Sequence, residues 1–200
     1  MAHGQGKRTR RPRRRVARRI LVVTEGTKTE PVYVEGLGRY LRSAGATAIV
    51  KTASVGKDPL KVVQKCVEQR DDAASKEKSY DECECIVDVD EHKSLDDAID
   101  LAGRERITLL ISNLKFEVWL RWHAEDRRSA LTSSQLDEHA TKLDLVKGKM
   151  LTPSFPFDKV HDACEVARSA DPDMRAGRKG PNPSSAMPIL VDLMEGKRAR

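Results

Sequence analysis

Short apolar runs alternate with longer amphipathic stretches between residue 20 and residue 123. Apolar positions spaced three or four residues apart predict helices, and short apolar runs predict buried strands. The predicted strands are residues 20–24, 47–54, 84–90 and 107–112. The predicted helices are residues 31–44, a helix after Asp58, residues 94–105 and a helix containing Phe116, Trp119 and Leu120. Near-continuous apolar strands that alternate with helices predict an α/β fold, with a parallel sheet covered by helices on both faces.

Local signals mark several of these helix ends. Pro31 suits a first helical turn, and Gly45 suits the end of the same helix. Asp58 followed by Pro59 is typical of an N-cap and a first-turn proline. Ser94 or Asp96 is expected near the start of the third helix.

The pattern weakens beyond Leu131. Residues 133–143 predict a short helix that begins at Ser133 or Ser134, and residues 150–170 predict turns followed by a helix. Residues 171–184 are rich in Gly, Pro and charge, which predicts a long loop. A last helix is expected at about 184–195, starting at Ser184 or Ser185. We therefore expect a core over residues 20–130 and a helical appendage over 131–200 that packs on it.

Hydropathy and cysteine usage set limits on the class of protein. No apolar run approaches the roughly 20 residues that cross a bilayer, and the N-terminus lacks the apolar stretch of a secretory signal. We therefore expect a cytoplasmic protein without a membrane partner. The four cysteines fit no CxxC pair and no zinc spacing, so free structural thiols are expected. Cys83 and Cys85 alternate with Glu84 and should share one face of a strand.

Positive charge is concentrated at the N-terminus. Residues 1–19 hold nine of the 37 Lys and Arg and no acid, so the other 28 basic residues face 31 acidic ones, a net charge of −3. Such a segment cannot bury enough apolar surface to order itself, which predicts a disordered basic arm over residues 1–19. Its arginines, among them Arg13, Arg14 and Arg15, would bind nucleic-acid phosphates in a salt-sensitive way. The alternative is a solubilising tail.

Acidic residues follow three of the predicted strands. Glu25 follows the first strand, Asp88 and Asp90 end the third, and Glu117 lies one turn into the helix after the fourth. In open α/β sheets the functional crevice lies beyond the carboxyl ends of the strands. These carboxylates are therefore expected to meet at one rim of the sheet.

Gathered carboxylates repel one another unless a cation holds them. Oxygen ligands without a nearby histidine pair favour Mg²⁺ or Mn²⁺ over Zn²⁺, and such ions complete their shells with water and phosphate oxygens. The residues thus indicate phosphoryl or phosphodiester chemistry. Gly26, directly after Glu25, is expected to allow a positive φ and close approach of the backbone to a phosphate.

An acidic Glu-Gly loop after the first strand, with Asp-x-Asp after a later strand, is similar to the Toprim fold of topoisomerases, primases and OLD-type nucleases. Four stretches more closely resemble the RloB-like family of bacterial defence-associated proteins. They are TEGTKTEPVYVEGL, IVDVDEH, ISNLKFEVWLRWH and NPSSAMPILVDLM. The resemblance covers most of residues 20–195. It departs from the family pattern at Leu114 and Lys115, where a proline and a small residue are usual, and Lys115 adds a positive charge near the acids.

The resemblance implies a Toprim-like, Mg²⁺- or Mn²⁺-dependent nuclease that acts as a toxic effector in abortive phage defence. The implied substrate is RNA, with transfer RNA one option, or DNA, and a companion ATPase is an implied partner. Asp88 and Asp90 would hold the principal ion. Glu25 would complete a second metal site or transfer a proton at the leaving oxygen, and Glu30 would be an auxiliary ligand. Glu117 would reach the ion or cap its helix.

For several other residues the sequence leaves two roles open. Lys28 would contact phosphate or be a solvated loop lysine, and the same choice applies to Arg178 and Lys179 in the late loop. His92 and His123 are candidates for proton transfer, against the alternative of a packed or exposed histidine.

Three other functions compete with a nuclease. One is a non-catalytic nucleic-acid-binding or ATPase-partner module of a defence system, whose acids are vestigial. A phosphatase of the haloacid-dehalogenase type is disfavoured because its Asp-x-Asp follows the first strand rather than the third. A receiver-like phosphoacceptor would need a lysine after a late strand, where Ser112 and Asn113 stand.

Overall fold

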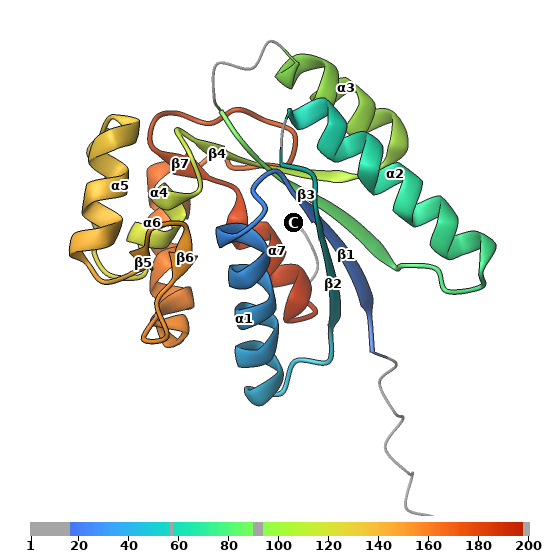
Figure 1. The fold of residues 1–200 in the computed structure, drawn as a ribbon, viewed down its shortest axis with the longest axis horizontal. Coiled ribbons are helices and arrows are strands. Elements are labelled where there is room, and N and C mark those ends of the chain that lie inside the picture. The colour runs from blue at the N-terminus through green and yellow to red at the C-terminus, as the bar shows by residue number, and fades with distance from the viewer. Residues whose placement is uncertain (1–16, 57, 90–93, 198–200) are drawn as a thin grey trace, which may run out of the picture.

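A five-stranded sheet with the strand order β2-β1-β3-β4-β7 forms the centre of the protein (Figure 1). The structure, a computed structural model, describes residues 17–56, 58–89 and 94–197. The strands are β1 (Arg19–Thr24), β2 (Ile49–Ser54), β3 (Glu82–Asp88), β4 (Thr108–Asn113) and β7 (Ser184–Ser185). The first four run parallel, and β7 pairs antiparallel with β4.

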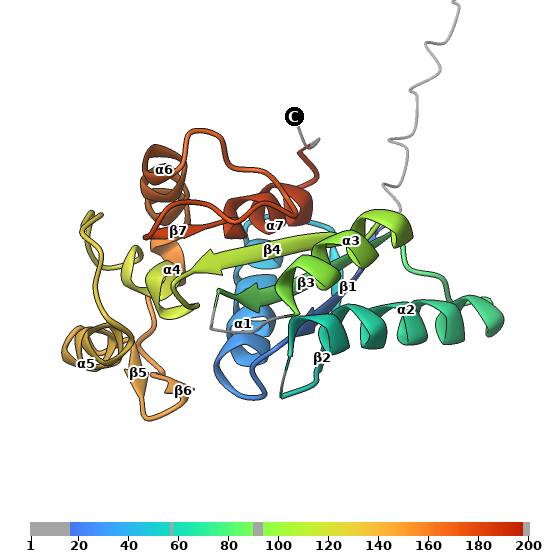
Figure 2. The same cartoon turned by 90° about the horizontal axis from the view of Figure 1, so that it is seen from above.

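Helices cover both faces of this sheet, with α2 and α3 on one side and α1 and α7 on the other (Figure 2). The helices are α1 (Thr29–Ser43), α2 (Pro59–Ser75), α3 (Leu95–Glu105), α4 (Glu117–Arg121), α5 (Ser133–Lys142), α6 (Val160–Ala170) and α7 (Met187–Met194). A 3₁₀ turn (Phe157–Lys159) precedes α6, and a small hairpin joins β5 (Val146–Lys147) to β6 (Met150–Leu151).

Strand alternation explains the two layers. In β1, Ile20 and Val22 enter the core beneath α1 and α7, whereas Leu21 and Val23 enter the core beneath α2 and α3. All four side chains are fully buried. This explains why the sequence of β1 is a continuous apolar run rather than an alternation of apolar and polar residues. The predicted α/β class, with helices on both faces of a mostly parallel sheet, is confirmed.

The predicted start of α2 is confirmed. The Asp58 carboxylate accepts hydrogen bonds from the backbone N–H groups of Leu60 (3.0 Å) and Lys61 (3.4 Å), while Pro59 occupies the first turn. Such a cap satisfies backbone donors that the helix cannot pair internally. Ser94 precedes α3 and donates its hydroxyl to the same Asp58 carboxylate at 2.9 Å. The starts of α2 and α3 are thereby tied together.

One prediction for the C-terminal part is confirmed and one is wrong. The helix α5 begins at Ser133, as predicted, and Thr132 caps it through a reciprocal pair of hydrogen bonds with Gln135. Ser184 and Ser185 do not begin the last helix, because they form β7. The Ser185 hydroxyl lies 2.9 Å from that of Ser112 on β4. The segment predicted as a helical appendage therefore also supplies a strand to the central sheet.

The first strand begins one residue earlier than predicted. Arg19 opens β1, its backbone N–H donates to Asp81 at 2.7 Å, and the Arg18 carbonyl accepts from the N–H of Ile49 at 2.8 Å. The C-terminal end of the predicted arm thus belongs to the sheet. The rest of the arm, with Arg13, Arg14 and Arg15, lies outside the described residues.

The cysteine prediction holds. Cys66, Cys83, Cys85 and Cys164 are all free. Cys83 and Cys85 both face the core beneath α2 and α3, as strand alternation requires. In the part of the chain that the structure describes, no helix combines the length and apolar character needed to cross a membrane.

Candidate functional site

Glu25 and Asp88 meet at the carboxyl end of the sheet. The Glu25 backbone N–H donates to the Ile86 carbonyl at 3.0 Å, which continues the pairing of β1 with β3 one residue beyond the strand. The Glu25 Oε2 atom accepts a hydrogen bond from the Asp88 backbone N–H at 3.3 Å. The predicted meeting of acids from the first and third strands is therefore present in the structure.

Glu30 lies in the first turn of α1 and is 9% exposed. Its carboxylate fills the space beside Gly26, where a Cβ atom would lie 2.0 Å from Oε2 and 2.1 Å from Oε1. Burial raises the pKa of Glu30, and the neighbouring carboxylates of Glu117 and Glu25 raise it further. Hydrogen bonds from the backbone N–H groups of Glu30 itself and Gly26 lower this pKa and so partly offset the rise. The predicted positive φ at Gly26 is wrong. A glycine is needed there because the Glu30 carboxylate occupies the position of a side chain.

Glu117 is the first residue of α4 and is partly buried. Burial raises the pKa of its carboxyl, and Lys115 opposes this effect. The Lys115 ammonium lies 3.9 Å from Glu117 Oε2 and 2.5 Å from Asp137 Oδ1. The lysine that departs from the family pattern does therefore place a positive charge beside the acids.

Asp88 lies at the centre of the carboxylates. Burial raises the pKa of its carboxyl well above the ordinary value, and three neighbouring carboxylates add to this effect. These neighbours are Glu30, Glu117 and Glu25. The N–H of Phe116 opposes them by donating a hydrogen bond to Asp88. Asp88 is half-buried, and like charges gathered around such a carboxyl favour either protonation or a bound cation.

The donor set fits a hard divalent cation. Every candidate ligand is a carboxylate oxygen, the chemistry that Mg²⁺ and Mn²⁺ prefer. Across residues 17–56, 58–89 and 94–197, however, no three His, Cys, Asp or Glu side chains are gathered closely enough to hold an ion by themselves. Mg²⁺ commonly binds through one or two carboxylates and keeps several waters, so a closed protein shell is not required. Asp90 and His92 lie outside the described residues.

Comparison with known proteins identifies the family. The family model described as RloB-like protein matches residues 20–194, most of the chain. The chain belongs to the RloB-like family. No curated protein and no solved structure matches it. The matched range contains Glu25, Glu30, Asp88 and Glu117, and leaves out the basic N-terminal segment.

His123 is a core residue of this RloB-like protein. It is 3% exposed, its Nδ1 lies 3.1 Å from the Trp119 carbonyl, and its Nε2 lies 3.1 Å from the Tyr33 hydroxyl. Burial lowers the pKa of His123 to about 4. A neutral ring that donates to Trp119 and accepts from Tyr33 satisfies both contacts. This placement supports the packed-histidine alternative, since both ring nitrogens are engaged in buried contacts and neither is free to exchange a proton with a substrate.

Tyr33 is a residue that the sequence reasoning did not select. Its ring packs edge-on against Phe116 at a centroid distance of 5.4 Å and lies one turn after Glu30 on α1. The aromatic cluster around Tyr33 and His123 therefore forms a rigid support beneath the Glu30 and Phe116 side of the carboxylates. The signal was available only as a tyrosine on the buried face of a predicted helix.

The predicted phosphate-binding residues have different surroundings. Lys28 is exposed at the residue before α1, close in sequence to the acids. Lys179 is also exposed. Arg178 instead donates to both oxygens of the buried Asp171 carboxylate at 2.9 and 2.7 Å. Its guanidinium thus has a structural partner that orders the late loop, which argues against a role in gripping nucleic acid.

Proposed function

We propose that this RloB-like protein is a Mg²⁺- or Mn²⁺-dependent nuclease that hydrolyses phosphodiester bonds in RNA or DNA. One observation carries the proposal. The carboxylates of Glu30, Glu117 and Glu25 all raise the pKa of Asp88 at the carboxyl end of a parallel sheet, where Glu25 also accepts a hydrogen bond from the Asp88 N–H at 3.3 Å. A fold that needed only stability would not gather like-charged acids there, because each costs free energy to bury.

The ion would be held by Asp88 and Asp90, with Glu25 and Glu30 beside them. When bound, such an ion supplies positive charge that stabilises the negative charge developing on the phosphoryl oxygens. In hydrolysis a water oxygen bonds to phosphorus and releases a proton to solvent, the bond to the leaving oxygen breaks, and the leaving oxygen takes a proton. Glu25 is suited to transfer that proton, because its contact with the Asp88 N–H holds the carboxylate at the rim.

The resemblance to Toprim-like defence effectors supports a biological role within this proposal. The protein would act in the cytoplasm as a toxic effector against phage, together with a companion ATPase, and transfer RNA would be one candidate substrate. The second candidate is a nucleic-acid-binding or ATPase-partner module with vestigial acids. It is favoured by the lack of a three-ligand group among the described residues.

Cleavage assays separate these candidates. Purified full-length protein is incubated with total RNA and with plasmid DNA, in Mg²⁺, in Mn²⁺ and in chelator. Each assay is repeated with the neighbouring gene product, since a restrained effector would be inert alone. We expect divalent-dependent cleavage that is lost in Glu25→Gln and Asp88→Asn. Asp100→Asn, an exposed acid on α3, serves as the matched control and should cleave normally.

Expression toxicity gives an independent readout. Wild-type protein should arrest growth, and the two site variants should not, although they fold. Cleavage or toxicity at the wild-type level in Asp88→Asn would remove the catalytic proposal. Metal binding without any cleavage, in every format, would favour the binding module.

A further inference from the structure

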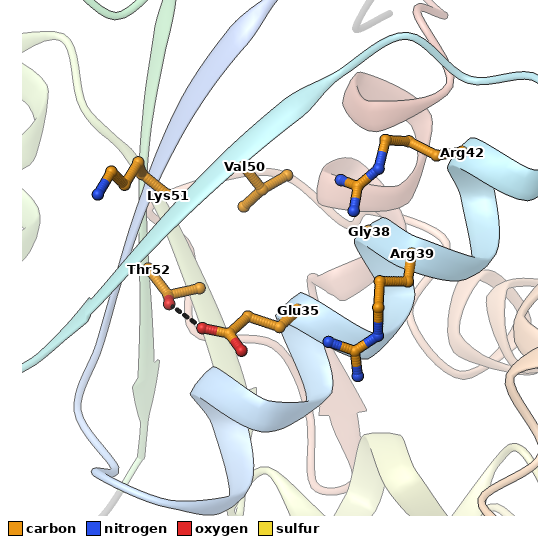
Figure 3. A pocket seen from close by; sticks show the side chains of 7 residues that line it. All are labelled: Glu35, Gly38, Arg39, Arg42, Val50, Lys51 and Thr52. Atoms are coloured by element: carbon orange, nitrogen blue, oxygen red, sulfur yellow. Dashed lines mark hydrogen bonds between the residues drawn. The ribbon is translucent and has the colours of Figure 1, made fainter.

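A hollow of about 350 Å³ lies between α1 and the edge strand β2 (Figure 3). It is lined by Glu35, Gly38, Arg39 and Arg42 of α1 and by Val50, Lys51 and Thr52 of β2. We refer to it as the α1–β2 hollow. The strand β2 is the last in the sheet order, so one side of the hollow is an open sheet edge.

The floor of the hollow is built by specific contacts. The Thr52 hydroxyl donates to Glu35 Oε1 at 2.8 Å, which holds the α1 side chain against β2. At Gly38 a Cβ atom would lie 3.5 Å from Arg42 Nη1 and 3.8 Å from Val50 Cγ2. The Arg42 guanidinium therefore lies beside Val50, over a helix surface that glycine leaves open.

The two arginines carry uncompensated charge. Arg39 and Arg42 are exposed and extend from the same side of α1, while Lys51 points away from them (Figure 3). No ion pair joins Arg39, Arg42 or Lys51 to a carboxylate within the described residues. Among the residues that the structure describes, Glu35 is the only acid that lines the hollow. The lining therefore has a net positive charge.

The hollow connects two features of the proposed nuclease. The helix α1 carries Glu30 in its first turn, beside the other carboxylates, and Arg39 follows nine residues later, about 14 Å along the helix. Beyond the end of α1, a second hollow is lined by Arg18, Gly45 and Glu195, among other residues. Arg18 is the last residue before β1 and adjoins the basic N-terminal segment in sequence. Arg39 and Arg42 thus place positive charge between the acidic rim and Arg18.

We propose that phosphate groups of a nucleic-acid strand lie in the α1–β2 hollow and bind Arg39 and Arg42. This inference rests on the proposed nuclease function, because it names the path of the substrate strand away from the carboxylates. A guanidinium presents planar, paired donors that match phosphate geometry. A polyanion is the occupant that uncompensated arginines attract most strongly.

Binding in chelator tests the path without any contribution from catalysis. Fluorescent single-stranded RNA and the matching DNA are titrated with full-length protein over a series of salt concentrations. We expect the Arg39→Ala/Arg42→Ala variant to bind more weakly, with a log–log salt slope reduced by about 1.4, or 0.7 per lost phosphate contact. The control variant Lys61→Ala/Arg104→Ala removes the same charge from α2 and α3, on the other face of the sheet, and should keep the wild-type slope.

A second variant is expected to change the affinity for nucleic acid in the opposite direction. Glu35→Gln removes the acid that lines the hollow and keeps an acceptor for Thr52, so we expect tighter binding. A photoreactive residue at position 50, which lines the hollow, should crosslink to the strand, and one at position 104 should not.

Two outcomes would overturn the inference. One is a wild-type slope in the Arg39→Ala/Arg42→Ala variant, which would assign the hollow to another partner such as an acidic protein surface. The other is an equal loss of binding in the control variant. Because no divalent ion is present, a protein that lacks nuclease activity would still show the arginine effect. A nuclease whose strand takes another path would cleave but bind independently of Arg39 and Arg42.

Discussion

The Glu25 carboxylate accepts a hydrogen bond of 3.3 Å from the backbone N–H of Asp88, 63 residues further along the chain. The contact joins the ends of two neighbouring parallel strands. It orients one acid toward Asp88, whose own carboxyl has its pKa raised by burial and by three neighbouring carboxylates. The position of Glu25 is therefore determined by the sheet rather than by its loop.

Asp88→Asn should stabilise the metal-free protein. Burial and neighbouring carboxylates raise the pKa of Asp88, so its charged form destabilises the fold at any pH above the ordinary range for aspartate. An amide removes that charge. We expect the thermal midpoint in chelator at about pH 8 to rise by roughly 2–4 °C for each kcal/mol gained. Millimolar Mg²⁺ or Mn²⁺ should then stabilise the wild type and leave Asp88→Asn unchanged. Equal stabilisation of both proteins would place the ion elsewhere.

Gly26→Ala should displace the Glu30 carboxylate. A methyl group would lie about 2 Å from both carboxylate oxygens, so one of the two must move. We expect divalent-ion affinity, measured by calorimetry, to fall about tenfold or more. Gly103→Ala is the matched control, because a Cβ atom there meets nothing within 4 Å on α3. That control should gain about 0.5–1 kcal/mol of stability and keep its metal affinity.

Glu84→Gln should change how stability depends on pH. Glu84 is 1% exposed, and burial raises the pKa of its carboxyl well above the ordinary value, against a hydrogen bond with Thr108. Because the folded state holds this proton more tightly than the unfolded state, stability is full below about pH 4.5 and falls as pH rises through the folded pKa. The loss approaches about 1.4 kcal/mol per pH unit. Urea unfolding should show that the free energy of unfolding of Glu84→Gln, relative to that of the wild type, is higher at about pH 8 than at about pH 5. The exposed Glu165→Gln serves as control, and an equal gain there would contradict the prediction.

Removal of residues 1–16 should flatten the salt dependence of nucleic-acid binding. This segment contains seven Lys and Arg, while Arg18 and Arg19 are retained because they pair with β2 and with Asp81. If each cation neutralises one phosphate of a single strand, the log–log slope should decrease by up to about 5. The thermal midpoint should not change. An unchanged slope would mean that the segment does not contact phosphate.

Most of the fold could be predicted because its signals are local. The strands before residue 113 were predicted from short apolar runs, and the N-cap of α2 was predicted from the adjacent residues Asp58 and Pro59. The meeting of Glu25 with Asp88 followed from a rule about parallel strands, without any knowledge of side-chain contacts.

The wrong predictions depended on contacts between distant residues. Ser184 and Ser185 form a strand only because β4 offers them a partner, and two serines carry no apolar signal of their own. The sequence also does not reveal that Arg178, a candidate for phosphate contact or for a solvated charge, pairs with Asp171. Gly26 was expected to allow a positive φ. In the structure, a side chain at this position would instead clash with the Glu30 carboxylate.

The helix α1 carries an acid of the proposed metal site at one end and the cationic pair further along. A helix keeps a fixed rise of about 1.5 Å per residue, so the separation of Glu30 from Arg39 and Arg42 is set at roughly 14 to 18 Å. The helix would then act as a molecular ruler. A nucleic-acid fragment too short to reach from the carboxylates to the arginines should lose both arginine contacts together. This would set a minimum substrate length for efficient cleavage.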